Sequence, residues 1–136
     1  MNRKLNGFTL LELLVVMVII GLLAGLVAPR YFSQVGKSQV KVAAAQIDSL
    51  DKAVVQFRLD ADRFPTSEEG LAALNEQPVD VVSWYGPYLK KAVPDDPWGR
   101  PFVYKEPGEH GDFDLYTLGK DGRPGGTAED ADITNW

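Results

Sequence analysis

The sequence predicts an α+β protein in which one long N-terminal helix packs on a small antiparallel sheet. Two observations predict this arrangement. An apolar run over residues 8–28 passes without a turn signal into an amphipathic stretch with helical periodicity. From residue 98 onward, short segments of β-type residues alternate with turns rich in glycine and proline. The length of 136 residues fits one domain carried by this helix.

The apolar run at residues 8–28 is long enough to cross a membrane. Its 21 residues are apolar except for Thr9, Glu12 and two glycines. A helix of that length spans roughly 30 Å, the thickness of a bilayer core. The preceding leader, residues 1–7, carries Arg3 and Lys4. Positive residues before an apolar run stay in the cytoplasm, so we expect the chain beyond residue 28 to lie across the membrane.

Two simpler interpretations of this run remain open. A secretory signal peptide has a shorter apolar region and a cleavage site between small residues. Here Glu12 interrupts the run, and Pro29 directly follows the best small-residue site, Ala28. A plain transmembrane anchor has no use for a carboxylate at this position, because an unpaired charge in lipid costs several kcal/mol.

The segment Gly7–Glu12, with the sequence GFTLLE, resembles the class III signal of type IV pilins and type II secretion pseudopilins. The resemblance rests on a tiny basic leader, a glycine before Phe8, and a glutamate five residues into the mature chain. It implies a type IV pilin-like fold. It also implies that a prepilin peptidase cuts between Gly7 and Phe8 and methylates the new amine of Phe8.

Such a cut would supply a partner for Glu12. The new amine of Phe8 is a cation at the end of an apolar helix, and Glu12 lies one turn further along. Both charges are costly in lipid unless they pair. The amine of a neighbouring subunit can pair with Glu12, which would fix the register of a filament, or Glu12 can pair within its own chain. We therefore expect Phe8 and Glu12 to take part in assembly.

Gly21, Gly25 and Pro29 are spaced four residues apart and so lie near one face of the apolar helix. They either make a thin, flexible membrane helix or form a seam for close packing against another helix. Pro29 removes a backbone donor, which predicts a kink or local unwinding between Gly21 and Arg30. The pilin resemblance implies that such unwinding accompanies packing in the filament.

Residues 29–62 are predicted to continue the helix with one apolar stripe. Apolar residues recur there at steps of three and four, and charged residues lie elsewhere. We expect this stripe to pack on the rest of the domain. The helix should end before Phe64-Pro65, because a residue that precedes proline avoids helical geometry. The stripe consists of Val40, Ala43, Ile47, Leu50, Val54 and Phe57.

The remainder of the chain is predicted to be a short helix, a connecting loop and a sheet. Thr66 and Glu69 form a capping box, which predicts a short helix over residues 67–75. Residues 76–97 are rich in proline and aromatic residues and should form an ordered loop. The sheet and an acidic loop occupy residues 98–136. Its expected strands are 102–104, 112–118 and a short third strand at 133–136.

The C-terminal region is acidic and rich in glycine. From Glu106 onward it holds eight acidic residues and two basic ones. Ordering four loop glycines costs much conformational entropy, and Ca²⁺, which takes six to eight oxygen ligands, offers a compensation. Asp121 could bind from one end of the loop, and Asp130 with Asp132 from the other. The spacing does not match an EF-hand, and a merely solvated loop is the alternative.

Two further segments, which begin at Asp96 and Phe113, resemble the major pseudopilin family of type II secretion systems. They read DPWGRPFVY and FDLYTLGKDG…GG…ADITNW. The resemblance implies a C-terminal loop that binds Ca²⁺ where many type IV pilins have a disulfide, which fits a chain without cysteine. The ligands it implies are the carbonyls of Leu118 and Arg123 and the side chains of Asp121, Asp130 and Asp132.

Composition excludes several other functions. Without Arg3 and Lys4 the net charge falls from −5 to −7, which argues against binding nucleic acid or anionic lipid headgroups. No cysteine is present, and His110 is the only histidine. We expect His110 to be a solvated turn residue. No nucleophile can be paired with a base, so the sequence predicts that the protein is not an enzyme.

Together, these features predict a structural subunit that polymerises into the periplasmic pseudopilus of a type II secretion system. The location implied is the inner membrane, crossed once, with the C-terminal domain in the periplasm. Partners implied by the resemblance are further copies of the chain, minor pseudopilins, the inner-membrane platform and its ATPase, prepilin peptidase and the outer-membrane secretin. The alternatives are a pilin of an adhesion, motility or competence fibre, and a monomeric membrane-anchored binding domain.

Overall fold

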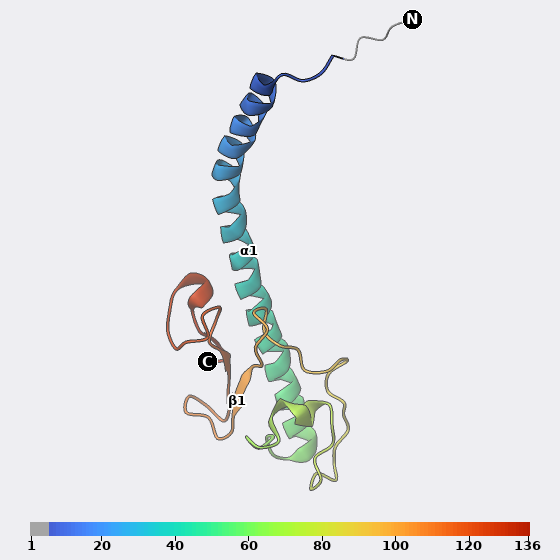
Figure 1. The fold of residues 1–136 in the computed structure, drawn as a ribbon. Coiled ribbons are helices and arrows are strands. Elements are labelled where there is room, and N and C mark those ends of the chain that lie inside the picture. The colour runs from blue at the N-terminus through green and yellow to red at the C-terminus, as the bar shows by residue number, and fades with distance from the viewer. Residues whose placement is uncertain (1–5) are drawn as a thin grey trace, which may run out of the picture. The chain divides into compact units, whose positions relative to one another are not determined.

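The computed structural model describes residues 6–136, which form two compact units, one ending at Val35 and one spanning Gly36–Trp136. Residues 1–5 of the expected leader lie outside the described residues. The long helix α1, Leu10–Ala61, contributes to both units. This long helix is followed by short 3₁₀-helices and three short strands, which confirms the α+β prediction (Figure 1).

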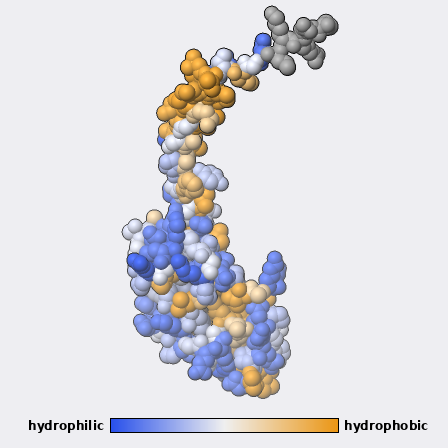
Figure 2. Space-filling view, in the orientation of Figure 1, coloured by the Kyte–Doolittle hydropathy of each residue, from blue (hydrophilic) through white to orange (hydrophobic). Residues whose placement is uncertain are grey.

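In the first unit, α1 is apolar all around. Nearly every large side chain from Phe8 to Phe32 is more than 45% exposed. Figure 2 shows a strongly hydrophobic surface around the N-terminal part of this helix, which becomes more polar toward the end of the unit. Among residues 6–136, α1 is the one helix long and apolar enough to cross a membrane. A helix that exposes apolar side chains on every side needs lipid or other helices around it.

α1 runs through Gly21, Gly25 and Pro29 without a break. The local unwinding expected there is therefore absent from this single chain. A proline removes one intrahelical hydrogen bond, here to the carbonyl of Gly25, and the intact turns on both sides hold the helix together. The unwinding implied for packed filaments stays a prediction.

In the second unit, α1 supplies one face of the core, as its periodicity predicts. Ile47, Leu50, Val54 and Phe57 are at most 3% exposed. They belong to one hydrophobic cluster with residues of the turn, the connecting loop and the sheet. Outside α1, the buried side chains of this cluster are Leu71, Ala73, Leu74, Val81, Phe102, Phe113 and Leu115.

A short helix is present where one was expected at residues 67–75, but it begins three residues later, ends one residue earlier and is a 3₁₀-helix. The capping box is present: the Thr66 amide donates to Glu69 Oε2 (2.9 Å) and the Glu69 amide donates to Thr66 Oγ1 (3.2 Å). However, Gly70 has φ +59°, a left-handed conformation that ends right-handed helix at that point. A turn is followed by the 3₁₀-helix η1, Gly70–Leu74, instead.

The sheet has three antiparallel strands in the order β1-β2-β3. They are β1, Val103–Lys105; β2, Asp114–Thr117; and β3, Ile133–Thr134. The third strand expected from the sequence is confirmed, and all three strands are close to their predicted positions. A second 3₁₀-helix, η2, Ala128–Asp130, lies in the acidic loop and was not predicted.

Two polar side chains fasten the sheet to its surroundings. Asn135 Oδ1 accepts from the Leu115 amide (2.9 Å), and Asn135 Nδ2 donates to Asp51 Oδ1 on α1 (3.0 Å). Asp96, only 4% exposed, accepts from the Thr117 hydroxyl of β2. These contacts tie the C-terminal segment to α1 and the turn before β1 to β2.

Candidate functional site

The first candidate site is the start of α1, where processing and assembly were predicted. Gly7 has open space around it, and Phe8 is 84% exposed just before the helix. The Thr9 amide donates to Glu12 Oε2 (3.3 Å), and the Glu12 amide donates to Thr9 Oγ1 (3.2 Å). Thr9 and Glu12 therefore form a capping box like that of Thr66 and Glu69.

This capping box was missed from the sequence, although Thr9-x-x-Glu12 is the same motif that was recognised at Thr66. It places the Glu12 carboxylate at the N-terminal end of α1, one residue away from the Phe8 amine that cleavage would create. In the described chain, the Glu12 carboxylate already accepts a hydrogen bond from the backbone N–H of Thr9.

The glycine face of α1 is open. A Cβ atom added at Gly21 or Gly25 would meet nothing within 4 Å beyond its chain neighbours and the adjacent backbone of the helix. The room left by these glycines is therefore not used inside the chain. It is available for close approach of another helix, as a packing seam requires.

The second candidate site is the acidic C-terminal loop, which contains all five predicted metal ligands. The Arg123 amide donates to Asp121 Oδ1 (3.0 Å), which closes a turn between these two residues. The Gly125 amide donates to Asp132 Oδ2 (3.0 Å), which joins the middle of the loop to its far end. Both carboxylates keep a second oxygen free of recorded hydrogen bonds within residues 6–136.

Close backbone crossings in this loop require glycine. A Cβ at Gly119 would lie 2.8 Å from the Asp130 carbonyl oxygen, and a Cβ at Gly126 would lie 2.5 Å from the same oxygen. Gly119 and Gly126 both have positive φ. The Asp130 carbonyl therefore lies between two glycines. An open hollow of about 570 Å³ adjoins this crossing and is lined by Lys120, Asp121, Thr127, Ala128, Glu129 and Asp130.

The donors in this loop have the chemistry of a Ca²⁺ site, because they are carboxylate and carbonyl oxygens. Within residues 6–136, however, no three His, Asp or Glu side chains are gathered closely enough to hold a metal. Asp121, Asp130 and Asp132 with the carbonyls of Leu118 and Arg123 would be five ligands, and at least one carboxylate would have to bind through both oxygens to reach six. The ligand set stays a prediction.

Arg100 also contacts this loop, a contact that could not be predicted from the sequence. Its Nη1 donates to the Gly119 carbonyl (2.9 Å) and its Nη2 donates to the Lys120 carbonyl (3.0 Å). The two carbonyls belong to the residues between Leu118 and Asp121. Arg100 thus holds the backbone at one end of the predicted metal site.

Glu129 docks the same loop on α1. Its carboxylate pairs with Lys120 Nζ (2.8 Å). A Cβ at Gly36 would lie 2.6 Å from Glu129 Cγ and closer still to its carboxyl group. Gly36 is the first buried residue of α1. A helical glycine costs about 1 kcal/mol relative to alanine, and here it makes room for this side chain.

His110 lies in an exposed bend, as we expected, but its side chain also has partners that the sequence did not indicate. Its Nδ1 lies 3.0 Å from Asp114 Oδ2, and its ring stacks on Trp136 with a centroid distance of 3.9 Å. The Asp114 carboxylate is almost fully buried and also accepts from the amides of Glu109 and His110. Burial by itself raises the pKa of Asp114, but these hydrogen bonds and the charge of protonated His110 outweigh burial and lower it.

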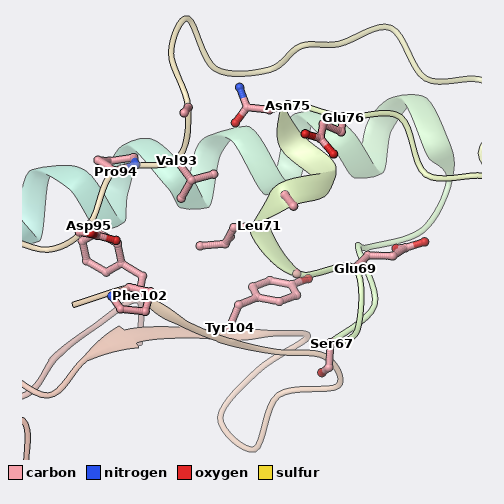
Figure 3. Close-up of a pocket in the computed structure, with 14 residues that line it drawn as sticks. Ser67, Glu69, Leu71, Asn75, Glu76, Val93, Pro94, Asp95, Phe102 and Tyr104 are labelled. Atoms are coloured by element: carbon pink, nitrogen blue, oxygen red, sulfur yellow. The ribbon is translucent and has the colours of Figure 1, made fainter. Parts of the chain in front are cut away.

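A hollow of about 560 Å³ lies between η1, β1 and the connecting loop, with Leu71, Phe102 and Tyr104 at its centre (Figure 3). The Tyr104 hydroxyl donates to the Pro65 carbonyl (2.7 Å), and burial raises the pKa of Tyr104. The Glu69 carboxylate pairs with Arg63 (2.7 Å), a contact that lowers the pKa of Glu69. The side chains of Tyr104 and Glu69 are thus engaged in holding the turn.

Comparison with known families places both candidate sites inside matched regions. Residues 30–136 match the family described as type II secretion system (T2SS), protein G. Residues 2–28 match the prokaryotic N-terminal methylation motif. The two matches meet near Pro29, where the apolar part of α1 ends.

Curated relatives are similar over nearly their full length. The type II secretion system core protein G of Pseudomonas aeruginosa is 42% identical, over 99% of this chain and 97% of the relative. The type II secretion system core protein G of Escherichia coli K12 is 43% identical, over 98% of this chain and 92% of the relative. A solved structure, the major pseudopilin of enterohaemorrhagic E. coli, superposes with a TM-score of 0.63 at 31% identity, covering 74% of this chain and 88% of the other.

The lowered pKa of Asp114 predicts a loss of stability in acid. The carboxylate binds a proton more readily in the unfolded chain, so its contribution is full above the ordinary Asp pKa and is lost as pH falls below about 4. We expect thermal unfolding of the detergent-solubilised chain, followed from pH 6 to pH 3, to show a shallower decline in Asp114→Asn than in the wild type. Equal declines in both proteins would contradict this role.

Proposed function

The chain belongs to the protein G family of the type II secretion system, so it is a structural pseudopilus subunit and not an enzyme, and we propose how its two ends serve that role. The observation that carries the assignment is the 42% identity over 99% of the chain, which spans the N-terminal motif and the C-terminal loop alike. The solved major pseudopilin shares the fold.

We propose that residues 8–28 cross the inner membrane once and that the domain beyond them lies in the periplasm. The exposed apolar surface of α1 supports this location, because it needs a non-aqueous environment until subunits pack together. Among the partners, copies of the same chain come first. Minor pseudopilins, the inner-membrane platform with its ATPase, and the outer-membrane secretin are the further proposed partners.

Processing is proposed to occur between Gly7 and Phe8 by prepilin peptidase, with methylation of the Phe8 amine. The match to the N-terminal methylation motif supports this step. The geometry also favours it, since Gly7 and Phe8 precede α1 and are exposed to an enzyme. A peptidase reaches a segment outside a helix more easily than a helical one.

Assembly is proposed to use the pairing of Glu12 with a Phe8 amine, either of the same chain or of a neighbouring subunit. The capping box with Thr9 supports a Glu12 carboxylate that faces the N-terminal end of the helix. The open faces of Gly21 and Gly25, together with Pro29, would admit a neighbouring helix in the filament.

We also propose that the C-terminal loop binds Ca²⁺ through the carbonyls of Leu118 and Arg123 and through Asp121, Asp130 and Asp132. The support is the hard-oxygen chemistry of the donors and the glycine-permitted crossing at Asp130. The ion would supply positive charge and cross-link the two ends of a loop that no disulfide closes.

The N-terminus of the protein tests the assignment against its alternatives. We expect mass spectrometry of the protein purified from membranes to show a chain that starts at N-methylated Phe8. An intact Met1 would instead support a monomeric anchored domain. Secretion by a strain that lacks the gene separates a pseudopilin from a pilin: export of folded proteins should be lost, whereas a loss of adhesion or motility alone would contradict the assignment.

Substitutions of Glu12 separate its two contacts. Glu12→Gln can still accept from the Thr9 amide but cannot form an ion pair. If ionic pairing sets the register of assembly, Glu12→Gln and Glu12→Ala should both reduce the sheared filament fraction at least about tenfold, a change that corresponds to about 1.4 kcal/mol. Filament yield at the wild-type level in Glu12→Gln would show that the charge is not needed.

Removing Ca²⁺ tests the proposed metal loop. A ligand at 100 times its dissociation constant stabilises the folded state by about 2.7 kcal/mol. EGTA should therefore lower the melting temperature of the full chain in detergent by several degrees, and Asp121→Ala should abolish the effect. Glu68→Ala, which removes an exposed carboxylate elsewhere, is the control and should keep it. A wild-type melting temperature that does not respond to EGTA would rule out the site.

A further inference from the structure

We propose that Arg100 positions the metal loop: its guanidinium holds the backbone of Gly119 and Lys120 so that the neighbouring oxygens of Leu118 and Asp121 are placed for a cation. This inference rests on the proposed Ca²⁺ site and adds to it a residue outside the predicted ligand set. Arg100 lies about twenty positions before the loop and reaches it only through the fold.

The backbone of Arg100 is held in position by the turn that begins at Asp96. Asp96 Oδ1 accepts from the amides of Trp98 (3.0 Å) and Arg100 (2.9 Å), and the Asp96 amide donates to the Arg100 carbonyl (2.7 Å). The other Asp96 carboxylate oxygen accepts from Thr117 at the end of β2. The backbone of Arg100 is therefore held at a set position relative to the strand that leads into the loop.

The guanidinium head matches the loop backbone. Two carbonyls of successive residues, Gly119 and Lys120, converge on its two terminal nitrogens. Successive carbonyls in an extended strand point in opposite directions, so this convergence needs the positive φ of Gly119, +71°. On the other side, a Cβ at Gly122 would lie 2.8 Å from Arg100 Cζ. The loop thus folds around the guanidinium.

In this arrangement, some oxygens of the loop bind the Arg100 guanidinium and others are left for the metal ion. The carbonyls of Gly119 and Lys120 are engaged by Arg100. The Leu118 carbonyl before them and the Asp121 side chain after them remain for a metal. A planar guanidinium with forked donors can hold two acceptors at once, whereas an ammonium on a flexible stem is a point charge. Holding the turn in advance reduces the entropy that metal binding must overcome.

The positive charge of Arg100 also acts against a nearby dication, so the experiment must separate charge from geometry. Arg100→Gln removes both the charge and the fork, and Arg100→Lys keeps the charge alone. Lys90→Gln, in the connecting loop, makes the same change of net charge away from the site and is the matched control. Lys90 is exposed.

The first measurement needs no metal. Lys120 is the only lysine after Lys105, so cleavage by a lysine-specific protease after residue 120 reports opening of the loop. The measurement is made in EGTA with the full chain in detergent. We expect Arg100→Gln to increase this cleavage rate about tenfold. The rate of Arg100→Lys should lie between those of the wild type and Arg100→Gln, and the rate of Lys90→Gln should match the wild type. Equal rates in Arg100→Gln and the wild type would overturn the proposal.

The second measurement is the apparent dissociation constant for Ca²⁺ from the shift in melting temperature. A positioning role predicts a constant about tenfold higher in both Arg100 variants. A lower constant in Arg100→Gln would overturn the proposal, because it would show that charge repulsion is the main effect. If the wild type does not respond to Ca²⁺, the metal site is wrong, while the EGTA cleavage still decides whether Arg100 holds the loop.

Discussion

The apolar stripe along the C-terminal part of α1 is the support on which the second unit depends. Phe57 and Val54 are fully buried, and the single core cluster joins them to η1, the connecting loop and the sheet. Strands of two to four residues cannot form a stable sheet by themselves. They persist because one face of the sheet packs on this stripe and because Asn135 bonds both β2 and α1.

Local sequence patterns predicted the elements whose cause is local. A stripe with helical period identified the buried face of α1, and alternating segments between turns identified the strands. The helix at residues 67–75 was predicted too long because its capping box is genuine but Gly70, directly after the box, adopts positive φ. A glycine permits that conformation without requiring it, so the sequence could not decide between continuation and a break.

Contacts between distant residues were beyond prediction. The loop composition indicated Asp121 and Asp132, yet nothing indicated that Arg100 bonds backbone carbonyls there or that Glu129 lies on Gly36. Backbone carbonyls are the same at every residue, so a side chain that binds them leaves no pattern in the partner. The contacts of His110 were missed for a related reason: its partner Trp136 comes from the far end of the chain.

The capping box of Thr9 and Glu12 limits how much energy the Glu12 carboxylate can gain by pairing with a Phe8 amine. Because the carboxylate already accepts from a backbone N–H at the start of α1, it is not an orphan charge in a single subunit. A neighbouring Phe8 amine would have to compete with this contact and with the amine of the same chain. The net gain from pairing between subunits is then small, and its geometry matters more than its energy. Such a contact is suited to setting the register between subunits, while the exposed apolar surface of α1 supplies the driving force for packing.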